Sequence, residues 1–316
     1  MNDEGPSVAP SPGNRGVGPA PRSITIVVPA YNAERTVGNV IQGLRKQRPP
    51  PDEIIVVDDG SADGTAGLAA RLGARVVRTE GGYAGGARNR GWDVATGDIV
   101  VFLDADSVPA PDWGAGLARA LAEFPGAIIG CARTFSARTA WGWVGYLQSE
   151  TPYLPLGDPR QVAFVCSYCM AVPRHASLRW DESYGGEDGI FCVDALNAGI
   201  ELVFDPRFQT FHDHEKDSFT SLRRHQDRLA YSIARIGSVQ REALRKRILP
   251  RVPVHYFALV RLLAIYRRVR ALPEYRAHFL RGLPRMVVAE WTLGLSALRY
   301  ARRPPPIRGQ SWAGLR

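Results

Sequence analysis

The chain has 316 residues, of which 45% are hydrophobic and 22% are charged, a composition typical of a globular protein with one large or two medium-sized domains. Its four cysteines are too few and too scattered for a disulfide scaffold, which favours a reducing compartment and a cytoplasmic location. No uninterrupted apolar run approaches the length of about 18 residues that a membrane-spanning helix needs, so we expect no such helix.

Charge is distributed unevenly along the chain. Residues 1–215 carry 18 Lys/Arg and 26 Asp/Glu, whereas residues 216–316 carry 22 and 5, so the net charge of +9 combines an acidic body at −8 with a basic region at +17. Such a region attracts nucleic acid, anionic lipid or an acidic protein. Its arginines are interleaved with aromatic and aliphatic residues, which favours a membrane surface as the partner and argues against nucleic acid.

The first half of the chain has an alternating strand and helix pattern. Residues 1–22 are rich in Pro, Gly and Ser without the apolar stretch of a signal peptide, and we predict a disordered leader. From residue 23, β-branched runs alternate with helical patterns, which predicts an α/β fold with a doubly wound, mostly parallel sheet. The predicted strands are residues 24–28, 53–57, 74–77 and 97–103, and the predicted helices are residues 36–48, 63–72 and 87–95.

The second half is less regular. We predict a helix over residues 111–124, strands at 127–131, 162–172 and 201–204, and a helix that opens at Gly185 and stops at Gly199. Residues 132–161 read as an irregular, aromatic-rich segment and a candidate for the acceptor side of a site. The region beyond Ser218 is predicted to be helical and basic.

Carboxylates follow two of the predicted parallel strands. Asp104 and Asp106 come directly after the strand at 97–103, and Asp58 and Asp59 come after the strand at 53–57. Ligands of open parallel sheets bind at the carboxyl ends of the strands. A carboxylate pair there favours a hard divalent cation, although Asp-x-Asp also occurs in simple turns. A carboxylate after an early strand can also accept hydrogen bonds from a nucleobase or ribose.

A glycine-rich loop indicates phosphate binding. Residues 81–86 contain four glycines and open a helix that bears Arg88, and backbone N–H groups with an Arg fork suit phosphate oxygens. The residues after the first strand, 29–34, lack the glycines of a dinucleotide fingerprint or a phosphate loop, which excludes NAD and P-loop ATP sites. Cys166 and Cys169 form a Cys-x-x-Cys with no second pair at zinc-ribbon spacing, so we interpret them as buried thiols in a strand.

Five stretches, in this order, resemble the family 2 glycosyltransferases, which have the GT-A fold. The resemblance covers about residues 22–215 and rests on Val27–Asn32, Ile55–Ser61, Ala87–Gly91, Phe102–Asp106 and Gly185–Asp188. It implies a nucleotide-sugar donor, Mg²⁺ or Mn²⁺, and inversion at the anomeric carbon. It divides the chain into a GT-A domain at 23–215 (a nucleotide-sugar half at 23–107 and an acceptor half at 108–215), a basic amphipathic helical extension at 216–303 and a flexible tail at 304–316.

The resemblance also implies roles for particular residues. Pro29, Tyr31, Asp59 and the neighbouring Asp58 would surround the nucleobase side of the donor, and Arg88 would lie against the diphosphate, the alternative for Arg88 being a surface charge. Asp104 would face the ribose and the metal, and Asp106 would bind the metal. His212 would join the metal or diphosphate site, the alternative being a solvated loop histidine, and His214 fits the same pattern less well.

Asp188 is the predicted general base, because an inverting transfer needs a carboxylate to accept the acceptor's proton. Glu187 is the second candidate and a helper, and the alternative for both is a helix cap. The Gln-x-x-Arg-Trp motif of processive members is absent after His214, which argues against polymer synthesis. Cys169 replaces the Asn of many relatives, which leaves the acceptor contacts open.

Two classes of function follow from these features. The first is a metal-dependent, inverting, non-processive enzyme whose acceptor is lipid-linked, a glycan or a small natural product. The second is a non-catalytic module of the same fold, which would usually have lost Asp106 or Asp188. A sugar nucleotidyltransferase is disfavoured because its glycine-rich loop after the first strand is missing. Leu283, Val287, Trp291, Leu295 and Leu298 recur at helical spacing among arginines, so the extension is expected to dock on the cytoplasmic face of a membrane or to pack on the catalytic domain or a second subunit.

Overall fold

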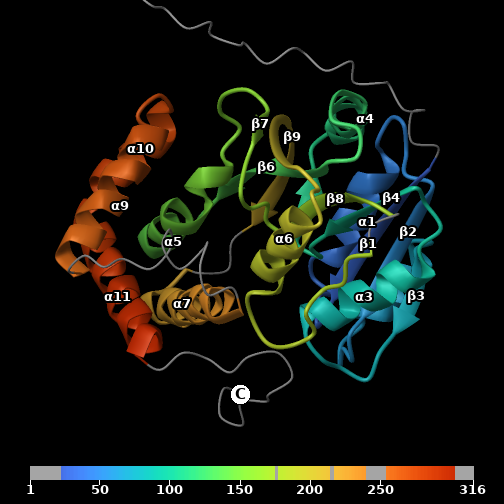
Figure 1. The fold of residues 1–316 in the computed structure, drawn as a ribbon, viewed down its shortest axis with the longest axis horizontal. Helices are drawn as coiled ribbons and strands as arrows, with labels where there is room; N and C mark the ends of the chain where they lie inside the picture. The colour runs from blue at the N-terminus through green and yellow to red at the C-terminus, as the bar shows by residue number, and fades with distance from the viewer. Residues whose placement is uncertain (1–22, 175–176, 214–216, 240–253, 303–316) are drawn as a thin grey trace, which may run out of the picture.

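A nine-stranded sheet lies at the centre of the protein, with helices on both of its faces (Figure 1). The structure is a computed structural model that describes residues 23–174, 177–213, 217–239 and 254–302. The predicted leader at residues 1–22 and the tail at 304–316 lie outside the described residues, as does His214.

The first half of the sheet is parallel, as predicted. Its order is β3-β2-β1-β4, and every neighbouring pair in it runs parallel. The four strands are β1 (Ile24–Ala30), β2 (Glu53–Asp58), β3 (Arg75–Arg78) and β4 (Ile99–Leu103). Because parallel strands all end at one edge, the polar residues that follow β1, β2 and β4 gather at that edge.

Side chains of these strands alternate between two hydrophobic clusters, one on each face of the sheet. Val28, Val56 and Val101 pack in the cluster that includes α1, α2 and α4, whereas Val27 and Phe102 pack in the cluster that includes α3 and α6. This burial on both faces is why the strands read as continuous apolar runs. The helices are α1 (Val37–Arg45), α2 (Thr65–Arg71), α3 (Ala84–Val94), α4 (Trp113–Glu123) and α6 (Glu187–Asn197).

The second half of the sheet mixes directions. β8 pairs antiparallel with β4 and β6, β6 pairs parallel with β9, and β5 and β7 each pair antiparallel with β9. Half of the eight pairings among the described strands are therefore antiparallel, so the expectation of a mostly parallel sheet applies to the first half. The strands are β5 (Ser107–Pro109), β6 (Ile128–Ser136), β7 (Arg160–Gln161), β8 (Cys169–Pro173) and β9 (Leu202–Asp213).

Residues 132–161 were expected to be irregular, and this prediction is wrong. β6 continues to Ser136, and α5 (Ala140–Glu150) follows, with the Thr139 side chain accepting a hydrogen bond from the backbone N–H of Gly142 at the helix start. Every residue from Gly142 to Gln148 in α5 is buried, because the helix lies between the sheet and the extension. A helix buried on nearly all sides shows no amphipathic period, which explains the error.

Three other boundaries differ from those predicted. α3 begins at Ala84, inside the glycine-rich loop, and β8 begins only at Cys169, so Cys166 lies in a loop instead of a strand. The four cysteines are free thiols, and all except Cys166 are buried. β9 extends to Asp213, which places His212 in a strand paired with β5 and β6 instead of in a loop.

The described part of the extension is helical, as predicted, and one side of it packs on α5. Its helices are α7 (Phe219–Val239), α9 (Val254–Val269), α10 (Pro273–Arg281) and α11 (Leu283–Arg302). Ile265, Phe279 and Met286 join Tyr146 and Leu147 of α5 in one hydrophobic cluster. None of the described helices has the length and hydropathy needed to cross a membrane.

Candidate active site

The predicted donor-side carboxylates lie at the carboxyl end of β2, where they organise the neighbouring loops. Asp58 is buried and its Oδ1 accepts a hydrogen bond from the backbone N–H of Ser61 at 3.2 Å. Asp59 accepts hydrogen bonds from the Thr79 hydroxyl and, at 3.1 Å, from the backbone N–H of Gly82. Asp59 thus ties the end of β2 to the glycine-rich loop, so these two features share one wall of the site.

The other two predicted donor-side residues lie at the end of β1, next to β2. Pro29 is half-buried and pairs in register with Val57, and Tyr31 follows it with 66% of its side chain exposed. Asn32 has a positive φ of 48°, and its side-chain oxygen accepts a hydrogen bond from the backbone N–H of Ala62 at 2.9 Å. Asn32 thus ties the segment after β1 to the turn that follows Asp58, and the exposed Tyr31 ring next to it is available to stack on a planar base.

Arg88 joins the two acidic motifs that the sequence separates by more than 80 residues. It projects from α3 and is 3% exposed, so it is not a surface charge. One guanidinium nitrogen donates to Asp104 Oδ1 and the other to Glu187 Oε1, both at 3.1 Å, and the group lies over the Trp180 ring. These carboxylates raise the pKa of Arg88 against the opposing effect of burial, so the guanidinium stays charged.

Asp188 follows Glu187 in the first turn of α6. Gly185 and Gly186 precede it with φ values of 72° and 81°, a conformation that side-chain-bearing residues rarely adopt, and Gly186 is the N-cap of the helix. Burial, and then the negative charge of Glu187, raise the pKa of Asp188 to about 7, although Arg88 opposes this change. A carboxyl group that titrates near neutral pH is suited to accept a proton during a reaction.

Asp106 and His212 meet at the junction of β4, β5 and β9. Asp106 Oδ2 and His212 Nε2 are 3.0 Å apart, and Arg133 lies 3.7 Å from the other carboxylate oxygen. Burial alone would raise the pKa of Asp106, but the hydrogen bond and charge of His212, together with Arg133, lower it to about 2. Asp106 is therefore ionised at neutral pH.

The donor atoms of Asp106 and His212 fit one divalent cation. Neighbouring ligands of an octahedral ion with bonds of about 2.1 Å are about 3 Å apart, which is the separation of these two atoms. Asp104, the third predicted ligand, instead pairs with Arg88. Within the described ranges no group of three His, Cys, Asp or Glu is arranged to hold a metal, so the remaining ligands would have to be water or donor phosphates.

Two site residues escaped the sequence analysis. Arg133 of β6 is buried between Asp106 and Glu150, with its guanidinium over the Tyr168 ring at 4.1 Å. The Cys166 thiol lies 3.8 Å from Asp188 Oδ2. Arg133 could have been found as an arginine directly after an apolar run. It was missed because the strand was predicted to end at residue 131, whereas β6 continues to Ser136.

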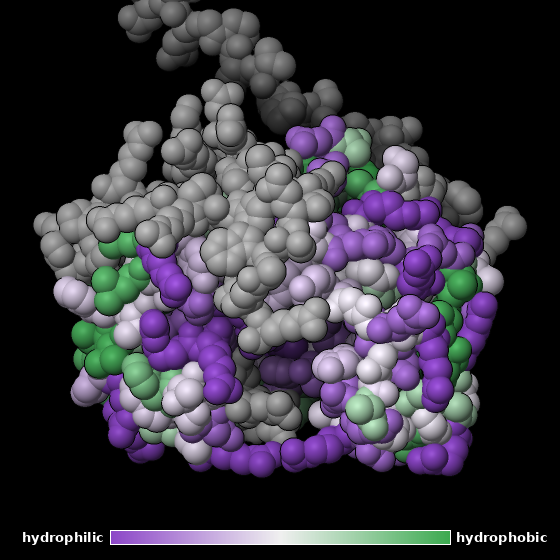
Figure 2. Space-filling view, turned by 90° about the horizontal axis from the view of Figure 1, so that it is seen from below, coloured by the Kyte–Doolittle hydropathy of each residue, from purple (hydrophilic) through white to green (hydrophobic). Residues whose placement is uncertain are grey.

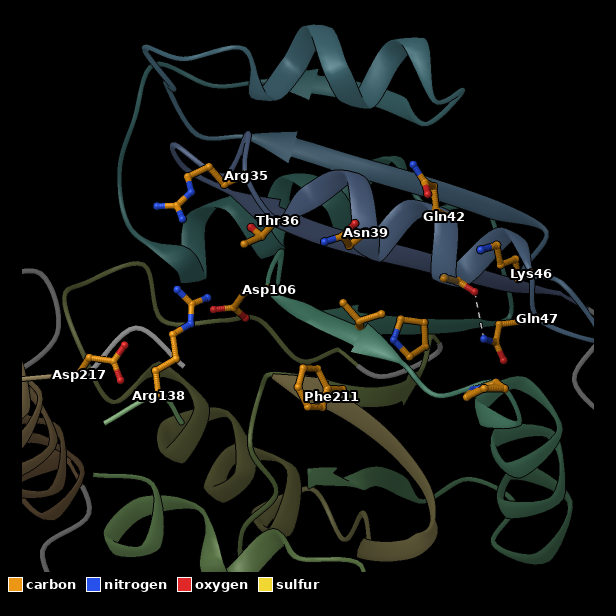
Figure 3. A pocket seen from close by; sticks show the side chains of 14 residues that line it. Arg35, Thr36, Asn39, Gln42, Lys46, Gln47, Asp106, Arg138, Phe211 and Asp217 are labelled. Carbon is orange, nitrogen blue, oxygen red and sulfur yellow. Dashed lines mark hydrogen bonds between the residues drawn. The ribbon is translucent and has the colours of Figure 1, made fainter. Parts of the chain in front are cut away.

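A cavity of about 830 Å³ opens beside Asp106, between α1 and the β5–β9 pair (Figure 3). Arg35 and Arg138 approach Asp106 at one end of it, Lys46 lies at the other end, and Phe211 lines the wall opposite α1. Of the predicted site residues, its described lining includes Asp106 and none of the residues on α3 or α6. The cavity therefore adjoins the Asp106 side of the site and not the Asp188 side.

The chain is similar to known glycosyltransferases. Residues 25–179 match the model of the family "Glycosyl transferase family 2". The chain is 39% identical over 95 residues to the amylovoran biosynthesis glycosyltransferase AmsB of Erwinia amylovora, covering 27% of this chain and 31% of that one. It is 29% identical over 216 residues to the pre-mycofactocin glycosyltransferase of Mycobacterium tuberculosis, covering 62% and 44%. The chain thus spans less than half the length of these relatives.

A solved structure shares the fold over most of both chains. The mannosyltransferase PcManGT from Pyrobaculum calidifontis, in complex with GDP-Man and Mn²⁺, superposes with a TM-score of 0.56 and 18% identity, covering 88% of this chain and 87% of that one. The family match covers the first four of the five motifs, and the fifth, Gly185–Asp188, follows shortly after its end. Residues 25–179 belong to the family 2 glycosyltransferases, and the chain has the GT-A fold.

Proposed function

We propose that the protein is a metal-dependent, inverting, non-processive glycosyltransferase that moves a sugar from a nucleotide-sugar donor to an acceptor hydroxyl or phosphate oxygen. The observation that carries this proposal is the buried Arg88, which holds Asp104 of one acidic motif and Glu187 of the other at 3.1 Å each. This bridge brings the donor edge of the sheet and the start of α6 into one site.

The donor side of the site consists of Pro29, Tyr31, Asp58 and Asp59. The Tyr31 ring, exposed at the end of β1, would stack on the nucleobase, and the Asp59 region would hydrogen-bond to the base or ribose. The start of α3 follows the loop that binds Asp59, and backbone N–H groups at a helix start favour a diphosphate. These residues bind and orient the donor without taking part in bond breaking.

Asp106 and His212 would hold Mg²⁺ or Mn²⁺, with Asp104 facing the same region. When bound, the cation would stabilise the charge that develops on the nucleoside diphosphate leaving group. Arg133 keeps Asp106 ionised and oriented, since it lies 3.7 Å from this carboxylate and is itself anchored by Glu150 at 3.6 Å. The chain would supply these two ligands, and water or donor oxygens would supply the others.

Asp188 would act as the general base. The acceptor oxygen attacks the anomeric carbon, the bond from that carbon to the diphosphate oxygen breaks, and the acceptor proton moves to Asp188 Oδ. A single displacement of this kind inverts the anomeric centre. Glu187 is bound to Arg88 and therefore positions the start of α6 instead of accepting the proton.

A screen of nucleotide sugars tests this function. Purified protein is tested for thermal stabilisation by UDP- and GDP-sugars with Mn²⁺, because a bound ligand raises stability by mass action, and for sugar release or transfer in the same mixtures. GDP-sugars are an obvious first choice because the structurally similar mannosyltransferase was solved with GDP-Man and Mn²⁺. Stabilisation without turnover for any donor and acceptor pair would instead support the non-catalytic module.

We also propose that the extension docks on an anionic membrane surface. Four residues of the predicted stripe, Leu283, Val287, Trp291 and Leu295, are exposed, and the fifth, Leu298, is half-buried. α11 packs inward through other residues, among them Met286 and Leu293. α9 exposes Leu259, Leu263 and Tyr266 in the same way. Figure 2 shows hydrophobic patches next to hydrophilic ones on the side where Figure 1 places these helices.

The positive charge of the same helices favours an anionic lipid surface as the partner of this exposed apolar face. Glu274 is the single exposed acidic residue in the described part of α9 to α11. The exposed arginines are Arg267, Arg268, Arg270, Arg276, Arg281, Arg285 and Arg299. Each cation near an anionic leaflet contributes about 1 kcal/mol, and apolar side chains insert at the headgroup boundary.

Co-sedimentation with vesicles tests this docking. The full chain should sediment with phosphatidylglycerol-containing vesicles at low salt and stay in solution with phosphatidylcholine vesicles. If it stays in solution with both, the membrane proposal fails, and a second copy of the chain becomes the occupant to test by the molar mass in solution.

A further inference from the structure

The loop that leads into the candidate base has no regular structure of its own. Residues 180–186 directly precede α6 and contain neither helix nor strand. The last two residues, Gly185 and Gly186, have positive φ values, so the chain reaches Asp188 through a turn that few sequences can adopt. The position of Asp188 therefore depends on what holds this loop from outside.

α3, on the donor side, holds the first part of the loop. The Asn89 side chain accepts a hydrogen bond from the Trp180 backbone N–H at 2.9 Å and donates to the Trp180 carbonyl at 3.0 Å. Gly85 allows the close approach, since a Cβ atom there would lie 2.0 Å from the Asp181 carbonyl oxygen. The loop is thus anchored to the same helix that carries Arg88.

α7, in the extension, holds the other side. Arg235 is 1% exposed, and its two terminal nitrogens donate to the Gly185 carbonyl and to Asp181 Oδ1, each at 2.7 Å. One guanidinium group therefore joins both ends of the loop. The next residue, Ile236, packs where a Cβ on Gly189 would lie 2.1 Å from its Cδ1 atom, so α7 also contacts the first turn of α6.

Aromatic contacts follow the same path. Tyr184 of the loop lies between Tyr83 at the start of α3 and Tyr231 of α7, with ring centroids 5.5 and 5.4 Å away. The ring of Tyr231 in turn meets that of Tyr300 of α11 at 5.6 Å. The loop is therefore clamped between the donor-side helix and the extension.

We propose that Arg235 of the extension is a positioning residue of the transfer reaction: by joining Asp181 to Gly185 it fixes the loop that sets the position of Asp188. This inference rests on the proposed function for its catalytic consequence. The bonds of Arg235 to Asp181 and Gly185 act on the loop that precedes Asp188, so its proposed effect is on the geometry of the base. The planar fork of Arg suits a carboxylate and a carbonyl at once, which explains the residue type.

The extension therefore has a catalytic consequence as well as a docking surface. A displacement of a reacting group by about 1 Å can cost about 100-fold in rate. Loss of Arg235 should accordingly lower the turnover number while leaving donor binding intact, because the donor-side residues lie on β1, β2 and the start of α3.

The test compares Arg235→Gln with Arg223→Gln as a matched control. Arg223 lies on the same helix but donates to the Thr292 carbonyl of α11, away from the loop. We expect Arg235→Gln to lower kcat by about 10- to 100-fold, with the Kd of GDP or UDP plus Mn²⁺ changed less than about twofold. Arg235→Lys should recover part of the loss, and Arg223→Gln should keep kcat per folded molecule.

A second readout does not need turnover. Hydrogen exchange of residues 180–189 should be faster in Arg235→Gln and unchanged in Arg223→Gln. If burial of an unpaired Asp181 prevents folding, the double variant Asp181→Asn/Arg235→Gln removes that charge and is measured in its place. Equal exchange in the two variants, or kcat of Arg235→Gln within about threefold of wild type, overturns the inference. Failure of the wild type to transfer sugar from any donor refutes the proposed function instead, and the exchange result still decides whether Arg235 holds the loop.

Discussion

The two halves of the sheet differ in how their candidate site residues are held. In the first half, Asp58 and Asp59 are fixed by backbone N–H groups and hydroxyls from segments close by in the sheet, such as Ser61, Thr79 and Gly82. In the second half, Glu187 is held by Arg88, and the loop before it is held by Arg235 of the extension. Contacts to the nucleobase and ribose should therefore be a property of the first half, whereas the proposed metal site and the geometry of the chemical step require both halves.

Arg88→Met should produce the largest effect, because Arg88 binds a carboxylate from each acidic motif, Asp104 after β4 and Glu187 in α6. The change leaves Asp104 and Glu187 as unpaired, partly buried carboxylates, a loss that typically costs about 3–5 kcal/mol of unfolding free energy. We expect loss of nucleotide binding and of turnover together, measured by calorimetry and a transfer assay. Arg90→Met, an exposed arginine on the same helix, is the control and should change neither. Wild-type donor affinity in Arg88→Met would show that the two halves are not linked through this residue.

The pH dependence of transfer distinguishes the base from the donor-binding residues. Since the pKa of Asp188 is raised to about 7 and the base must be ionised, kcat/KM should fall about tenfold for each pH unit below that value. The effect on stability has the opposite dependence on pH. The folded state favours the protonated form of Asp188, so this residue lowers the free energy of unfolding increasingly as pH rises from its ordinary pKa of 3.8 to about 7. Asp188→Asn should thus unfold at a higher temperature than wild type at pH 8, and the two should agree below pH 4. A flat kcat/KM profile from pH 5 to 8 would remove Asp188 as the base.

Asp59→Ala tests the first half alone. Losing the bonds to Thr79 and Gly82 should loosen the glycine-rich loop and weaken nucleotide binding by about tenfold, equivalent to about 1.4 kcal/mol, with kcat at saturating donor unchanged. Asp52→Ala is the matched control, because Asp52 accepts a backbone hydrogen bond from Ile24 at the opposite end of β1. A fall in kcat with unchanged affinity would place Asp59 in the chemical step instead.

The smallest effect on transfer to a water-soluble acceptor is expected from Leu263→Asp/Trp291→Asp. Both side chains are about half exposed, at 51% and 45%, and lie outside the hydrophobic cluster on α5. The variant should lose sedimentation with phosphatidylglycerol vesicles and keep wild-type kcat. Leu196→Asp, at 43% exposure on α6, is a control that should still sediment. Unchanged vesicle binding in the double variant would show that Leu263 and Trp291 are not part of a membrane-docking surface.

The sequence predicted the first half well because its signals are local. Each strand is an apolar run that stops at a polar residue, and the carboxyl ends of parallel neighbours necessarily meet, so Asp58, Asp59 and Asp104 could be grouped without a structure. α5 could not be predicted, because contacts with distant residues such as Met286 bury it on nearly every side and erase its period. Arg133 and Arg235 were missed for the same reason: a buried arginine is recognisable only through its partners, and Asp106 and Asp181 are distant in sequence.

The extension shows a related limit. Its apolar stripe on α11 was visible from the spacing of Leu283, Val287, Trp291 and Leu295, but sequence alone left open whether that stripe faces inward. The structure exposes these four residues, whereas Met286, Ala289, Leu293 and the polar Glu290, which is bound to Arg261, form the buried side of α11. Both sides of α11 carry large apolar residues, so their spacing alone could not identify the buried side.

The division between donor binding and chemistry is tested most directly by comparing Asp106→Asn with Asp188→Asn. Binding of UDP and GDP is measured by calorimetry with Mn²⁺ and with EDTA, and the chemical step by single-turnover transfer from the donor found in the screen. We expect Asp106→Asn to weaken Mn²⁺-dependent nucleotide binding, and Asp188→Asn to bind normally while the chemical step slows by about 100-fold or more. Poor nucleotide binding with retained turnover in Asp188→Asn, or wild-type affinity that is the same with Mn²⁺ and with EDTA, would contradict it.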